Sequence, residues 1–275
     1  MRHRALPVLR GLLTPVLVLA LVAISGCAKK PEPLVALPSP STLDLVAQHG
    51  ELRVCSTGDS RPFTFRDPVN GRWSGTDVDL AGDLAGRLGV RLTLVPTTWT
   101  TMLDDLGGGH CDIVMSGVPV TLDRALRAAY SQPYLTDGKT PITRCADVAR
   151  FQTLDQIDRP GVRAAVSPGG TNESFAKERL RKAKLISFPN STAGVQEILA
   201  GRADVMITDV SEARNQAKQH PGLLCAVNPD RPLSAGQKAY LLPRGDTVFQ
   251  QYVDTWLRIA QADGTFLRIN RPLTG

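Results

Sequence analysis

Short apolar runs alternate with amphipathic segments through most of this chain, and the alternation is interrupted once. Between residues 51 and 117, β-rich runs such as ELRVCST and VRLTLVP enclose TDVDLAGDLAGRLG, whose apolar residues recur at helical spacing until Gly89. Strands that alternate with helices in this way form a parallel sheet that helices cover on both faces. The sequence therefore predicts an α/β fold.

The same pattern restarts after an extended stretch near residues 137–145. GVRAAVSPGGT, KLISFP and ADVMITD are predicted strands separated by helical segments, and a second extended stretch follows near 225–240. We therefore expect two lobes of the type II periplasmic-binding-protein kind, each a mostly parallel sheet flanked by helices, joined by two hinge crossings. Lobe 1 is expected to comprise 44–142 and 229–275, and lobe 2 to comprise 143–228.

Residues 1–26 have the pattern of a secretory signal peptide, because a basic start precedes an apolar run. The small residues before Cys27 resemble a bacterial lipobox, in which this cysteine becomes the lipidated first residue. A plain signal peptide followed by a chance cysteine is the alternative. The Pro-rich residues 27–43 are typical of a stiff tether. We expect an exported lipoprotein, periplasmic or on the cell surface, that touches a membrane only through its N-terminal lipid.

The charge balance gives little indication of a macromolecular partner. The formal net charge of +6 falls to +3 once Arg2, Arg4 and Arg10 leave with the signal peptide. The one basic cluster, KERLRKAKL at 177–185, has the spacing of a solvated helix face, so no nucleic-acid partner is expected. The four histidines are far apart and no CxxC motif occurs, so no metal site is expected.

Four further cysteines lie in the part of the chain that is expected to reach an oxidising compartment, where disulfides can form. They allow three sets of pairings. We favour Cys145–Cys225, because the two extended crossings bring these segments to the same hinge. The sequence leaves the pairing state of Cys55 and Cys111 open, and two free, buried thiols are one alternative.

Polar segments follow several predicted strands, and ligands of open α/β sheets bind at such strand ends. PGGTNE places a glycine turn before a helix, where backbone N–H groups and the Thr171 hydroxyl could bind an anion. A helix cap made by Thr171 or Asn172 explains the same residues equally well. Arg124 could bind a carboxylate through its planar fork, although a surface arginine is the more ordinary interpretation.

Two aspartates, Asp59 and Asp209, also end predicted strands at the expected cleft. One of them could pair with an amino group or with Lys139. The ordinary alternative is that each caps a turn.

Several motifs resemble one known family. DVDLAGDLAGRLG, CDIVMSG, GGTNESF and GRADVMITD are similar to segments of the family 3 extracellular solute-binding proteins, which capture amino acids. TGDSRPFTFR, VPTTWTTML, DGKTPITRC, ARFQTLDQID, TDVSEAR and KAYLLPRG resemble a catalytic branch of that family, the exported cyclohexadienyl dehydratases, which act on prephenate or arogenate. The likeness runs from about Leu52 to about Ile269.

The resemblance implies that Glu212 is a general acid, which protonates the ring hydroxyl as it leaves while CO₂ departs. It implies further that Lys139 and Arg124 hold substrate carboxylates, and that Asp209 could accept the amino group of arogenate. No cofactor is implied, because the leaving groups depart without a redox change. The expected catalytic residues are Glu212, Lys139 and Asp59, and the expected substrate-binding residues are Trp99, Ser116, Gly117, Arg124, Ser167, Gly170, Thr171, Asn172 and Asp209.

Three residues depart from the family's pattern and could alter substrate preference. Ser60 stands where an aromatic residue is frequent, Pro119 where a serine or threonine is, and Ser167 where an asparagine is. The alternative function is a lipid-anchored receptor that delivers an amino acid or another small carboxylate to the permease of an ABC transporter. Glu212 would then be an ordinary residue in the first turn of a helix. The sequence does not indicate an oligomeric state.

Overall fold

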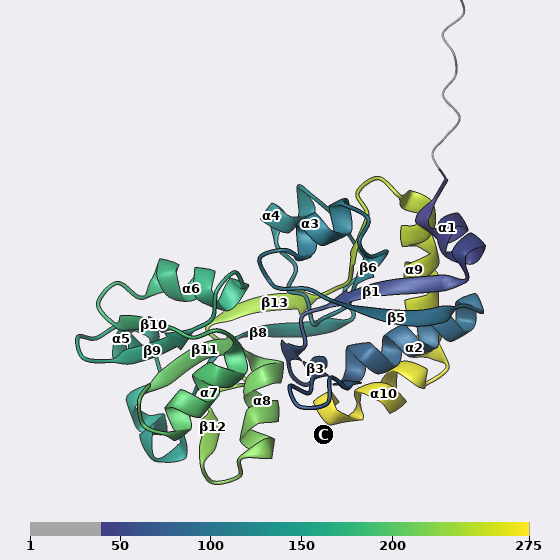
Figure 1. The fold of residues 1–275 in the computed structure, drawn as a ribbon. Helices are drawn as coiled ribbons and strands as arrows, with labels where there is room; N and C mark the ends of the chain where they lie inside the picture. The colour runs from purple at the N-terminus through teal and green to yellow at the C-terminus, as the bar shows by residue number, and fades with distance from the viewer. Residues whose placement is uncertain (1–39, 275) are drawn as a thin grey trace, which may run out of the picture. The chain divides into compact units, whose positions relative to one another are not determined.

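The computed structural model describes residues 40–274 (Figure 1). The expected signal peptide, Cys27 and the tether up to residue 39 lie outside the described residues. Helix α1 (Thr42–His49) follows directly, and the Ser41 side chain caps its first turn. None of the helices within residues 40–274 has both the length and the apolar character that crossing a bilayer requires.

The first sheet has five strands in the order β5-β1-β6-β14-β7. β5 and β6 run parallel to β1, whereas β14 is antiparallel to both β6 and β7. A separate three-stranded sheet lies in the same part of the chain. The strands of the two sheets are β1 (Glu51–Ser56), β5 (Arg91–Pro96), β6 (Ile113–Val114), β7 (Ala129–Tyr130) and β14 (Leu241–Leu242), and β2 (Asp59–Ser60), β3 (Thr64–Arg66) and β4 (Trp73–Ser74).

Helices cover both faces of the first sheet. Successive residues of β1 point to opposite faces, and each face packs against different helices. Val54 packs in one apolar cluster with helices α2 and α9, while Cys55 packs in another with α3. The helices of this part are α2 (Thr76–Leu88), α3 (Met102–Gly107), α4 (Leu122–Ala125), α9 (Thr247–Ala262) and α10 (Thr265–Thr274).

The second sheet has six strands, with the order β10-β9-β11-β8-β12 and with β13 also paired to β8. β9, β10 and β11 are parallel, whereas β8 runs antiparallel to its three neighbours. The α/β class with helix-flanked sheets is therefore confirmed, and both sheets are mixed. The strands are β8 (Leu135–Arg144), β9 (Arg163–Val166), β10 (Lys184–Ser187), β11 (Val205–Asp209), β12 (Leu224–Ala226) and β13 (Ser234–Lys238).

The second sheet is also covered on both faces. Val205 and Ile207 pack with α5 and α6, whereas Met206 between them packs with α7 and α8. The helices are α5 (Leu154–Ile157), α6 (Thr171–Arg179), α7 (Ser191–Leu199), α8 (Val210–Gln219) and the 3₁₀ helix η1 (Cys145–Arg150).

The chain passes from the first sheet to the second through β8 and returns through β13, and these two strands lie side by side (Figure 1). Their close approach explains the glycine of the DGK segment, because a Cβ at Gly138 would lie 2.2 Å from the carbonyl oxygen of Ser234. The expected crossings near 137–145 and 225–240 correspond to these strands. The expected lobe boundaries at 142/143 and 228/229 stay a prediction.

Two disulfides are present within the described residues. Cys145 is joined to Cys225, which is the pairing that the sequence favours. Cys55 is joined to Cys111, which excludes the alternative of two free thiols that the sequence left open. Cys55 lies in β1 and Cys111 precedes β6, and the two strands are neighbours in the sheet. The spacing of the cysteines in the sequence does not reveal that adjacency.

Replacing both Cys55 and Cys111 with alanine should lower the free energy of unfolding by about 2–4 kcal/mol, because the bond closes a loop between residues 56 positions apart. Denaturant unfolding of the variant and the parent protein measures the difference. Peptide mapping without reductant should recover the Cys55–Cys111 and Cys145–Cys225 peptides. Two titratable thiols at positions 55 and 111 in the unfolded, unreduced protein would contradict this assignment.

Candidate active site

The candidate site lies where β11 ends and α8 begins. Asp209 is the last residue of β11, and Glu212 lies in the first turn of α8. The antiparallel register of β8 places Lys139 directly opposite Asp209. α6 begins nearby, at Thr171, directly after the glycine turn that follows β9. Most of the expected site residues of the second lobe therefore converge at one edge of its sheet.

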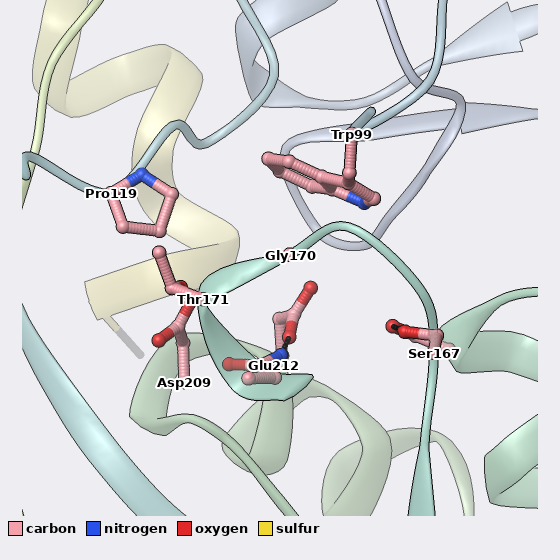
Figure 2. A pocket seen from close by; sticks show the side chains of 9 residues that line it. Trp99, Pro119, Ser167, Gly170, Thr171, Asp209 and Glu212 are labelled. Atoms are coloured by element: carbon pink, nitrogen blue, oxygen red, sulfur yellow. Dashed lines mark hydrogen bonds between the residues drawn. The ribbon is translucent and has the colours of Figure 1, made fainter. Parts of the chain in front are cut away.

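A pocket at this edge is lined by residues from both lobes (Figure 2). Trp99 follows β5 and Pro119 follows β6, so both come from the first lobe. The other lining residues come from the second lobe and are Ser167, Gly170, Thr171, Asn172, Ser191, Asp209 and Glu212.

Asp209 is held between two buried lysines. Its Oδ1 accepts a hydrogen bond of 2.6 Å from Lys139, and its Oδ2 accepts one from Lys238. Burial disfavours the charged carboxylate, but the two ammonium charges outweigh it and hold the pKa of Asp209 far below its usual range. Asp209 makes no helix-capping hydrogen bond. An amino group of a ligand would have to compete with both lysines for this carboxylate.

Lys139 uses its three N–H groups within the protein. Besides Asp209, they reach the Thr171 hydroxyl, at 2.8 Å, and the side-chain oxygen of Asn172. An ammonium group has only three donors, so in this arrangement Lys139 positions its neighbours and has no donor left for a substrate carboxylate.

Lys238 is a site residue that the sequence analysis missed. Its side chain is 1% exposed and also lies 3.8 Å from the Asp137 carboxylate. Burial favours the neutral amine, but the charges of Asp209 and Asp137 prevail and raise the pKa of Lys238. The available signal was its position in KAYLLPRG, where a single charge precedes an apolar run.

Glu212 is 7% exposed and accepts hydrogen bonds from three side chains. The Ser60 hydroxyl donates to Oε1 at 3.0 Å, while Asn172, at 3.4 Å, and the Thr208 hydroxyl donate to Oε2. Burial and the neighbouring charge of Asp209 raise the pKa of Glu212, against the lowering effect of Lys238. This carboxyl group therefore retains its proton at a higher pH than an exposed glutamate does.

Trp99 and Asp59 form one wall together, because the indole N–H donates to the Asp59 carboxylate at 3.1 Å. Burial raises the pKa of Asp59. Arg124 is buried, not on the surface, and its guanidinium lies 5.7 Å from the centre of the Trp99 ring. Arg124 donates to the Pro119 carbonyl oxygen at 2.9 Å, and no ion pair within residues 40–274 includes it.

Three expected substrate-binding residues have different surroundings. Ser167 lines the pocket, with its hydroxyl 3.3 Å from that of Ser191. Ser116 is fully buried and bonded to the hydroxyls of Thr57 and Thr64, so its side chain does not line the pocket.

Gly117 likewise does not line the pocket. Its N–H donates to Asp77 at 2.6 Å, and a Cβ there would lie 2.3 Å from the Phe63 ring. Its φ of +61° also requires glycine.

No group of histidine, cysteine, aspartate or glutamate side chains within residues 40–274 has the arrangement of a metal site. The site also contains several buried acids and bases, namely Lys139, Asp209, Glu212 and Lys238. Of these, Glu212 combines a raised pKa with a position on the pocket wall, which suits a proton donor.

Known proteins resemble the chain over most of its length. It is 50% identical, over 82% of each chain, to the cyclohexadienyl dehydratase of Pseudomonas aeruginosa. Its structure matches an ancestral amino acid-binding protein described as a precursor of cyclohexadienyl dehydratase, with a TM-score of 0.78 and 36% identity, covering 85% of this chain and 99% of that one. An ancestral cyclohexadienyl dehydratase matches with a TM-score of 0.54 and 47% identity, covering 86% and 97%.

The sequence pattern of the bacterial extracellular solute-binding proteins, family 3, matches residues 52–273. That range begins at the second residue of β1, includes every described element from β2 to α9 and covers most of α10. The chain therefore belongs to family 3 of the bacterial extracellular solute-binding proteins.

Proposed function

We propose that this protein is a cyclohexadienyl dehydratase, which removes water and CO₂ from prephenate, from arogenate or from both. The observation that carries the proposal is Glu212, a buried carboxyl group with a raised pKa on the wall of the pocket. The 50% identity with the Pseudomonas aeruginosa enzyme supports it.

The chemistry asks for an acid more than for any other group. Loss of the ring carboxylate as CO₂ makes the ring aromatic, so the difficult step is the departure of hydroxide. A carboxylic acid beside that oxygen protonates it as the bond breaks, an effect of about 10²- to 10⁴-fold on rate. Asp209 is held ionised by its two lysines. Its negative charge opposes ionisation of the nearby Glu212 and so favours the protonated form of that carboxyl group.

The substrate's carboxylates need cationic or N–H partners, and two groups offer them. Arg124 does not itself line the pocket, but it is buried against the lining residues Trp99 and Pro119 and has no carboxylate partner among the described residues. The N-terminus of α6 begins at Thr171, and its N-cap residue, Gly170, has no side chain to cap the first N–H groups. These groups thus take the role that the sequence analysis had assigned partly to Lys139. Trp99 provides a flat apolar wall for the ring.

The family is extracellular, and the proposed enzyme works outside the cytoplasm. We propose in addition that Cys27 carries a lipid that anchors the tether, as the lipobox-like sequence indicates.

An amino-acid receptor is the second candidate function. The structural match to an ancestral amino acid-binding protein favours it. The receptor would bind an amino acid and release it unchanged, so turnover of prephenate or arogenate by the purified protein separates the two candidates.

Glu212→Gln should lower kcat for prephenate by about 10²- to 10⁴-fold, because the amide keeps the shape and lacks the acidic proton. Phenylpyruvate formation measures the rate, and a thermal shift with prephenate tests whether binding survives. Glu197→Gln is the matched control, since Glu197 pairs with Arg202 on the surface of α7. A Glu212→Gln enzyme with the parent rate would exclude Glu212 as the acid.

The kcat of the parent enzyme should be high at low pH and fall as pH rises through the raised pKa of Glu212, because the acid acts only when protonated. Asp209→Asn should move this falling limb to lower pH, since it removes a negative charge and leaves two lysines uncompensated. Asp155→Asn on the exposed face of α5 is the control. A limb that stays in place in Asp209→Asn would show that Asp209 does not set the acid's pKa.

Arg124→Gln should raise KM for prephenate by about 10- to 100-fold and change kcat less, because a charged hydrogen bond to a substrate carboxylate contributes about 1.5–3 kcal/mol. Steady-state kinetics give both constants, with exposed Arg159→Gln as control. An unchanged KM would place the substrate carboxylates elsewhere.

A further inference from the structure

Glu212 forms part of the wall of a second cavity besides the substrate pocket. Ser191 and Glu212 are common to the two cavities, and the second one extends toward Arg61 and Gln216. Its cavity volume is about 10 Å³, which is close to the room that a single water molecule needs. The proposed acid is therefore reached from two sides.

The walls of this second cavity are suited to hold a water. Asp59, Arg61, Thr208 and Gln216 contribute a carboxylate, a guanidinium, a hydroxyl and an amide. A buried water needs two to four such partners to remain in place. Arg61 and Gln216 are partly exposed, whereas Thr208 is 1% exposed, so the cavity leads from near the surface toward the acid.

Hydroxyl groups connect this side of the molecule to both oxygens of Glu212. Thr208 lines the cavity and bonds to Oε2. Ser60, between the cavity residues Asp59 and Arg61 in the chain, donates to Oε1 at 3.0 Å. A hydroxyl both donates and accepts, so it can pass a proton between a water and a carboxylate.

The proposed reaction consumes one proton in each turnover. The bond between the ring and its carboxylate breaks, and its electron pair becomes a ring π bond. The carbon–oxygen bond breaks as the oxygen takes the proton of Glu212. Water and CO₂ leave, and Glu212 remains as a carboxylate that must regain a proton from bulk water before the next turnover.

We propose that the second cavity is the route by which Glu212 regains this proton, through a water held by Asp59, Arg61 and Gln216 and through the Thr208 hydroxyl. The inference rests on the proposed function. Through this route Glu212 can be reprotonated from the second cavity while product still occupies the substrate pocket.

The test is to fill the cavity without touching the acid. Val195 lines it, is 2% exposed and comes from α7. Val195→Leu adds one methylene where about one water fits. Val162→Leu adds the same group to a different apolar cluster of the second lobe and is the matched control. Gln216→Leu removes the polar group at the partly exposed end and serves if Val195→Leu fails to fold.

Enzyme is mixed rapidly with excess prephenate, and phenylpyruvate is followed from the first turnover onward. In Val195→Leu the first turnover should keep the parent rate, and later turnovers should slow by an amount on the order of 10-fold. This slow phase should quicken as pH falls, because the proton supply then rises. Gln216→Leu should show the same burst, and the parent and Val162→Leu should show none.

Two results would overturn the proton route. If the folded cavity variants keep the parent's steady rate, Glu212 is reloaded through the substrate pocket. If the first turnover slows as much as the later ones, the cavity residues affect only the geometry around Glu212 and not the return of its proton. Failure of the proposed function is distinct from both, because the parent enzyme itself would then form no phenylpyruvate.

Discussion

One buried carboxylate between two buried ammonium groups determines the geometry of the site. Lys139 comes from β8, Asp209 from β11 and Lys238 from β13, so the three strands must meet in a fixed register. Burying three charges costs several kcal/mol per ion unless each is paired, and removing one partner leaves the others uncompensated. Lys139 then fixes Thr171 and Asn172 at the start of α6. The charge cluster therefore positions the residues of α6 that line the pocket.

The same cluster bears on the choice between enzyme and receptor. Asp209 would be the natural partner for the ammonium group of an amino acid, but the protein's own lysines already occupy both of its oxygens. The cluster nevertheless acts on Glu212, whose pKa the Asp209 charge raises and the Lys238 charge lowers. The two lysines leave no oxygen of Asp209 free for the ammonium group of a ligand, and the cluster shifts the pKa of Glu212. This arrangement favours proton transfer over capture of an amino acid.

The sequence predicts the fold well where periodicity decides, as in the α/β alternation, and the two extended crossings between the lobes predict the pairing of Cys145 with Cys225. It does not show which strands are neighbours, and for that reason the bond between Cys55 and Cys111 and the antiparallel direction of β14 escaped prediction. In the site, motif position located Glu212, but it could not show which way a side chain points. Ser116 was expected at the ligand and instead bonds to hydroxyls behind the pocket.

Ser60 shows how binding and acid strength are linked in this site. It belongs to the first lobe, whereas Glu212 belongs to the second. Its hydroxyl, 3.0 Å from the acid, completes the surroundings of a group whose own lobe supplies Thr208 and Asn172. The burial that raises the pKa of Glu212 thus depends on both lobes. The pocket is lined by residues of both lobes as well. The arrangement of the lobes that forms the pocket is therefore also the one in which burial raises the pKa of Glu212 and keeps it protonated.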